Sequence, residues 1–86
     1  MTVSGTEEQY RITKELRQKA LYFVYVIADF AEHYGLSLRA AFSYLQRYRG
    51  LDFIEQHYAA EHLLSMEDAV ADLTVICQRN GGGLAL

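Results

Sequence analysis

The stretch that decides the fold is 21–45, LYFVYVIADFAEHYGLSLRAAFSYL, which holds the end of one helical pattern, a turn and the start of another helix. Before the turn, apolar residues recur every three or four positions, the spacing that lines one face of a helix. Gly35 supplies the left-handed residue that ends this helix, and Ser37 can cap the next one. Followed back toward the N-terminus, the apolar face comprises Ile12, Leu16, Ala20, Phe23, Ile27, Phe30 and Tyr34.

The same signals extend to both ends of the chain. Thr6 and Gln9 resemble a capping box before the first helix, and Ser65, with an acidic residue three positions on, resembles one before the last. Gly50 closes the second helix, and Asp52 caps the third. We therefore predict four helices, near residues 7–34, 37–49, 52–60 and 66–79.

No alternating strand pattern is present, so the predicted fold is all-α: a compact bundle of about four helices with a long first helix. We expect one helical domain at 7–80, a disordered N-terminus at 1–6 and a flexible tail at 81–86. The predicted core is Leu16, Phe23, Ile27, Phe30, Leu36, Phe42, Leu45, Phe53, Ile54, Val70, Leu73 and Ile76.

Composition narrows the class of protein. The chain has 86 residues, a formal charge of −3 and one cysteine, which disfavours a basic nucleic-acid binder and a disulfide scaffold. The longest apolar run has about eight residues, against the roughly 18 needed to span a membrane, and no signal-peptide pattern opens the chain. We expect a cytoplasmic protein.

The first helix carries a second apolar face, turned away from its main stripe. This second face comprises Leu21, Val24, Tyr25 and Ala28. Either the other three helices surround the first helix, or this face is a partner surface.

The segment 31–45 also fits a helix-turn-helix unit. Its required small, turn and buried positions are filled by Ala31, Gly35, Leu36, Ala41 and Leu45. Under this alternative the protein is a DNA-binding regulator, and the side chains that read DNA are Arg39, Ser43, Gln46 and Arg47. The competing interpretation is an ordinary helix end followed by a capped helix.

No pattern of catalytic or metal-binding residues emerges. His57 and His62 are five residues apart, with Glu61 between them, so the two rings point about 140° apart on a helix and do not form a zinc pair. The apolar side of the last helix holds Cys77, which predicts an inert buried thiol. We therefore expect no enzyme activity, no metal, no cofactor and no small-molecule substrate.

Seven tyrosines suit sites where one end of the ring is packed and the other is wet. The candidates are Tyr22, Tyr25, Tyr44, Tyr48 and Tyr58. We predict that they lie at the rim of the bundle, where they could also contribute to a partner surface.

The segments FVYVIADFAEHYGLSLRAAFSYLQRYRGLDFIEQHYAAEH and LSMEDAVADLTVICQRNGG resemble a family of small bacterial and phage-type all-helical proteins, classed as a domain of unknown function. The marks of the resemblance are the turn at 35–37, the helix start at 51–53, the pair Glu61 and His62, and the run 72–82. The resemblance implies a gene often encoded beside an ADP-ribosyltransferase-like protein. That pairing suggests an antitoxin or an accessory subunit.

Taken together, these observations favour a non-catalytic protein–protein interaction module that binds a protein partner or a second copy of itself. An antitoxin or accessory role beside a toxin-like enzyme is its more specific form. The helix-turn-helix regulator remains the alternative.

Overall fold

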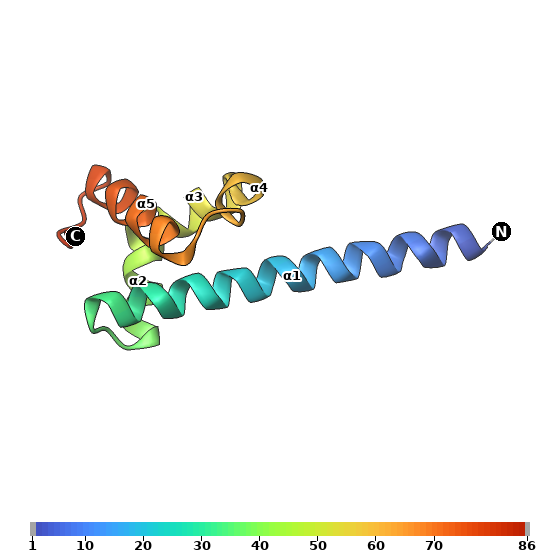
Figure 1. Cartoon of the computed structure of the whole chain (residues 1–86), viewed down its shortest axis with the longest axis horizontal. Coiled ribbons are helices and arrows are strands. Elements are labelled where there is room, and N and C mark those ends of the chain that lie inside the picture. The colour runs from blue at the N-terminus through green and yellow to red at the C-terminus, as the bar shows by residue number, and fades with distance from the viewer. Residues whose placement is uncertain (1, 86) are drawn as a thin grey trace.

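The computed structural model describes residues 2–85, with side chains from residue 7 onward. Five helices follow one another and no strand occurs within these residues, which confirms the all-α prediction. They are α1 (Thr2–Tyr34), α2 (Leu38–Arg47), α3 (Gly50–Gln56), α4 (Tyr58–Glu61) and α5 (Met66–Arg79). Figure 1 shows α3, α4 and α5 on one side of α1, with α2 crossing it near its C-terminal end.

The shape of the molecule is set by α1. At 1.5 Å per residue its 33 residues span about 50 Å, nearly the whole 54 Å length of a molecule that measures 22 Å in both other directions. Because α2 to α5 pack beside its C-terminal half, the N-terminal half of α1 projects past them (Figure 1). Every side chain from residue 7 to 18 is exposed, and we call this segment the arm.

The core lies where α1, α2, α3 and α5 meet. Phe30, Leu45, Ile54 and Leu73 are fully buried, as predicted, and Val70 is almost so. This core has six further members: Tyr22, Val26, Ala31, Ala41, Ala69 and Cys77. Of these, Cys77 was predicted to be buried as a thiol on the last helix, and Ala41 to fill a buried position of the helix-turn-helix unit. Five other predicted core residues are half-buried at its edge: Phe23, Ile27, Leu36, Phe53 and Ile76.

Two predicted core residues are wrong. Leu16 is 63% exposed because it lies on the arm, where it lines only an open groove with Tyr58 and His62. Phe42 is 45% exposed because α2 buries the line through Ala41 and Leu45, and Phe42 is turned by about 100° from Ala41. Both residues lie on helices, as predicted, but no other helix covers their side chains fully.

The turn between α1 and α2 forms as predicted. Gly35 has φ +65°, and the amide of Leu36 donates to the carbonyl of Ala31 at 2.8 Å. The Ser37 hydroxyl accepts from the Ala40 amide at 3.0 Å, which caps α2. The Ser65 hydroxyl caps α5 in the same way, accepting from the Asp68 amide at 3.1 Å.

The junction between α2 and α3 differs from the prediction that Gly50 ends the second helix and Asp52 caps the third. Arg49 takes the left-handed conformation, with φ 71°, and Gly50 is the first residue of α3. A Cβ on Gly50 would lie 2.8 Å from Cδ2 of Leu45 and 3.1 Å from Sγ of Cys77. Close approach of α3 to α2 and α5 therefore requires glycine here.

The predicted third helix is also interrupted. His57 has φ −116° and ψ 23°, which separates α3 from the single turn of α4. At the C-terminal end, the amide of Leu84 donates to the Tyr44 hydroxyl at 3.0 Å, which ties residue 84 to α2. The predicted disorder of 1–6 and flexibility of 81–86 stay predictions, and both the Thr6 side chain and residue 86 lie outside what the structure describes.

Candidate functional site

The second face of α1 is open in this structure. Leu21, Val24 and Tyr25 are 45%, 57% and 58% exposed, and Ala28 is half-buried. They point away from Val26 and the rest of the core because they lie on the opposite side of α1. The prediction that the other helices surround α1 is therefore wrong.

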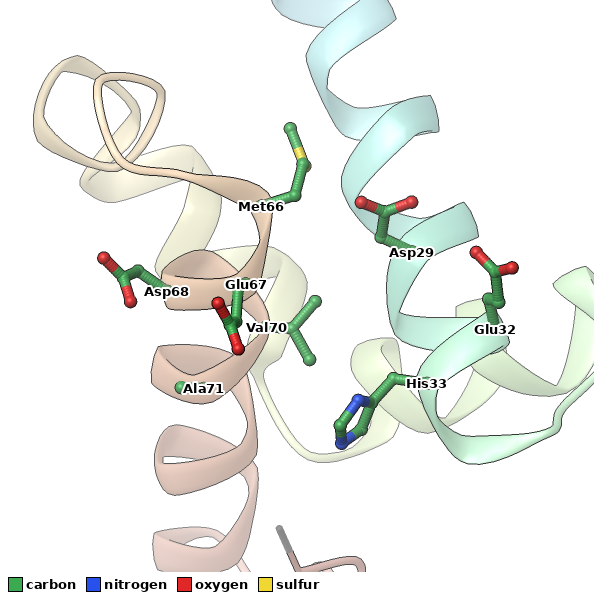
Figure 2. Close-up of a pocket in the computed structure, with 8 residues that line it drawn as sticks. All are labelled: Asp29, Glu32, His33, Met66, Glu67, Asp68, Val70 and Ala71. Atoms are coloured by element: carbon green, nitrogen blue, oxygen red, sulfur yellow. The ribbon is translucent and has the colours of Figure 1, made fainter.

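A groove runs beside this face, between α1 and the start of α5. It has a volume of about 690 Å³ and is lined by Asp29, Glu32, His33, Met66, Glu67, Asp68, Val70 and Ala71. Figure 2 shows His33 and Val70 pointing into the space between the two helices, with Asp29 and Glu32 along the α1 wall. Four carboxylates make this an acidic groove with an apolar floor.

The residues of the helix-turn-helix alternative share one exposed region. Arg39, Ser43, Gln46 and Arg47 are all exposed on α2, and Ala31, Ala41 and Leu45 are buried where α1 and α2 cross. The Arg47 guanidinium lies 5.6 Å from the centre of the Tyr48 ring. The local helix–turn–helix geometry is present, while only two basic side chains mark the supposed reading face.

The histidines have aromatic and backbone partners. His62 stacks on Tyr58 at 4.6 Å between ring centres, and its Nδ1 lies 2.7 Å from the Tyr58 carbonyl oxygen. His57 packs against Phe53 at 4.8 Å. In the part of the chain that the structure covers, no group of three or more His, Cys, Asp or Glu side chains is arranged to hold a metal ion.

The predicted buried thiol is confirmed. Cys77 is fully buried, and burial raises its pKa to about 11. A thiol with a raised pKa is a poor nucleophile at neutral pH because the reactive form is the thiolate.

The tyrosines divide between core and surface. The prediction that Tyr22 lies at the rim is wrong, because it is 8% exposed and its ring meets Tyr58 edge-on at 5.5 Å. Tyr44, Tyr48 and Tyr58 are half-buried, as expected of rim residues, and Tyr25 is the most open of the five.

Glu61, predicted above only as an unsuitable metal ligand and a mark of the resemblance, lies next to Asp72. The Glu61 side chain is buried, and a neighbouring carboxylate favours its protonated form. Burial first, and then Asp72, raise the pKa of Glu61 to about 7. No spacing rule joins residues 61 and 72, so only the tertiary structure reveals that these two carboxyl groups are neighbours.

Tyr22 connects this pair to α1. Its hydroxyl donates to the Glu61 backbone carbonyl at 3.2 Å, while Oε1 of Glu61 has no hydrogen-bond donor in the described structure. Burial and the neighbouring Glu61 raise the pKa of Tyr22 to about 12, so it stays a neutral donor. The hydrogen bond from Tyr22 joins α1 to α4, and Glu61 has Asp72 of α5 as its neighbour.

Comparison with protein families adds one identification. A family described as a protein of unknown function, DUF3791, matches residues 21–80. The chain belongs to the DUF3791 family. The match begins at Leu21, so it contains the bundle and the second face, while the arm precedes it.

No curated protein and no solved structure matches this DUF3791 chain. Between residues 2 and 85, none of the five helices combines the length and the apolar character that a membrane span requires.

Proposed function

We propose that this chain is a non-catalytic protein–protein interaction module whose partner surface is the second face of α1. The observation that supports the proposal is the exposure of Leu21, Val24 and Tyr25 on adjoining turns of a helix whose opposite side forms the core. Contiguous exposed apolar side chains are typical of interaction sites. Tyrosine is also among the residues enriched at the centres of interfaces.

In its more specific form, the proposal is that the chain acts as an antitoxin or accessory subunit of a toxin-like enzyme. The support is the resemblance described above and the acidic groove next to the second face. Binding would place the partner's basic side chains along Asp29 and Glu32. This form of the proposal predicts a stable complex and no catalytic contribution from this chain.

The test replaces Val24 or Tyr25 with Asp in the full-length chain. Because both side chains are already more than half exposed, the isolated chain should keep its helical circular dichroism and its melting temperature. A charge in an apolar interface has no compensating partner, so complexes should dissociate. Val75→Asp is the matched control, since Val75 is exposed on α5.

Co-purification from the native host, quantified by mass spectrometry, measures the outcome. Loss of the same captured protein, whether another host protein or an untagged copy of this chain, with Val24→Asp and Tyr25→Asp, and its retention with Val75→Asp, is the expected result. Equal capture by all variants, or unfolding of both second-face variants, would contradict the assignment of this face.

The helix-turn-helix alternative is favoured by one observation, the turn geometry at Gly35 with Arg39 and Arg47 exposed on α2. It predicts that Arg39→Ala and Arg47→Ala weaken binding to a promoter fragment. Affinity should also fall steeply between about 50 and 200 mM salt, because phosphate contacts release counterions. If the protein does not bind DNA, or if the two substitutions leave DNA binding unchanged, the protein–protein interaction module is the only proposal left.

A further inference from the structure

The second face of α1 has charged ends of opposite sign. Lys14 and Arg17 lie on the same side of the helix as the second face, on the arm. Glu32 lies in the same sector beyond the apolar centre, and Asp29 lies at its edge toward the acidic groove. Beyond Glu7 and Tyr10 at its N-terminal end, this side of α1 is therefore basic, then apolar, then acidic.

The two charged ends are equally far from the centre. Counted from residue 23, Arg17 lies six residues before and Asp29 six after, while Lys14 lies nine before and Glu32 nine after. With a rise of 1.5 Å per residue, these offsets are about 9 Å and about 14 Å on each side. Leu21 and Tyr25 are likewise two residues on either side.

These four charged side chains have no ion-pair partner among the described residues. The ion pairs there are Lys19 with Glu55 and Arg49 with Asp52, and neither involves them. Charges of both signs therefore flank an exposed apolar centre at matched distances along α1. Lys14 and Glu32 share one angular position, and Asp29 is turned by about 120° from Arg17.

From this pattern we infer that the occupant of the second face is a second copy of this chain, with its α1 antiparallel to the first. A twofold axis at residue 23 brings Lys14 of each copy beside Glu32 of the other, and Arg17 of each copy to the level of the other's Asp29. It also places Leu21 opposite Tyr25. Such an interface is isologous, because each contact occurs twice.

A parallel arrangement is disfavoured by the same charges. It would set Lys14 and Arg17 against their own copies, and Asp29 and Glu32 against theirs, and like charges side by side are destabilising. The self-complementary order of charges therefore selects the orientation as well as the partner.

The arm gives independent support for this arrangement. Its side chains are all exposed, and an isolated helix of about 12–15 residues is only marginally stable in water. In the antiparallel pair, each arm lies along the packed half of the other copy's α1. The arm itself projects beyond α2 to α5, so its own side is accessible to a second copy (Figure 1).

This inference rests on the proposed function and names the partner. It is tested by sedimentation equilibrium of the full chain, from about 1 to 500 micromolar, at low salt. We expect a monomer–dimer equilibrium. Lys14→Glu with Arg17→Glu, and separately Asp29→Lys with Glu32→Lys, should each weaken the dimer at least about tenfold by placing like charges together at both ends.

Mixing the two double variants should restore the dimer, because each reversed end then meets an opposite charge. The chain carrying all four substitutions should also dimerise like the wild type. Arg39→Glu with Arg79→Glu is the control for net charge, since both side chains are exposed and lie outside α1. It should dimerise normally.

A wild type that stays monomeric throughout would overturn the inference. So would a dimer unaffected by either double reversal, which is the result that a parallel pair or another face would give. A monomeric wild type that loses a host protein on Val24→Asp would refute the second copy while keeping the interaction proposal. If the wild type stays monomeric and no captured protein depends on Val24, both the dimer inference and the proposed interaction function would be refuted.

Discussion

The two halves of α1 have the same helical periodicity, but the apolar face is buried in one half and exposed in the other. From residue 22 to 34, the apolar stripe is covered by α2 and α5, and Val26 and Phe30 are fully buried. On the arm, Ile12 and Leu16 continue that stripe and are 50% and 63% exposed. Amphipathic spacing thus selects which face would be buried, and burial itself depends on whether another element is there.

The same contrast applies around the helix at one level. Val24 and Tyr25 neighbour Val26 in sequence, yet both are exposed while Val26 is inaccessible to solvent. A rotation of about 100° per residue separates core from surface. Substitutions in the packed half of α1 should therefore destabilise the fold far more than substitutions on the arm.

The largest expected effect separates Phe30 from Leu16. Phe30 packs against the rings of Tyr34 and Tyr44 at 4.9 and 5.8 Å, so Phe30→Ala should lower the free energy of unfolding by about 3–5 kcal/mol. Leu16→Ala on the exposed arm should change it by less than about 0.5 kcal/mol. Urea denaturation of dilute protein measures both values, and similar losses in the two variants would refute the contrast.

A smaller effect is the pH dependence of the unfolding free energy caused by Glu61, whose backbone carbonyl accepts the hydrogen bond from Tyr22 of α1. In the folded chain, the pKa of Glu61 is raised from 4.5 to about 7, so the folded state binds the extra proton between these values. The stabilisation is complete below about pH 4.5 and is lost as the pH rises through 7. The loss of unfolding free energy from pH 5 to pH 8 should be about 2 kcal/mol.

Glu61→Gln should remove this pH dependence, because its amide stays neutral and can donate to Asp72. Glu67→Gln, on the exposed first turn of α5, is the control and should retain the wild-type slope. Melting curves at several pH values compare the three proteins. Parallel slopes for wild type and Glu61→Gln would show that the pKa of Glu61 is not raised in the folded chain.

The smallest expected effect is at the border between the halves. The Nζ of Lys19 lies 2.7 Å from Oε2 of Glu55, with the side chains 30% and 62% exposed. A double-mutant cycle with Lys19→Ala and Glu55→Ala should give a coupling of less than about 1 kcal/mol, since exposed ion pairs contribute little. A coupling above about 2 kcal/mol would mean that the arm is held to the bundle more firmly than this contact suggests.

The sequence by itself determined the local features of this protein. The end of α1 at Gly35, the caps at Ser37 and Ser65, the all-α class and the apolar second face all follow from residues within a few positions of one another. Side-chain capping and helical periodicity act over one or two turns, which is why they could be predicted. Helical periodicity also predicts which residues lie on each of the two faces of α1.

Which of those faces is covered depends on contacts between distant segments. The left-handed Arg49 and the buried Gly50 depend on the approach of α3 to Leu45 and Cys77, and Glu61 and Asp72 become neighbours only in the folded chain. Leu16 and Phe42 are exposed because no other helix covers them fully. Burial, pKa values and open surfaces arise from contacts between distant segments, and sequence periodicity does not specify where those segments end.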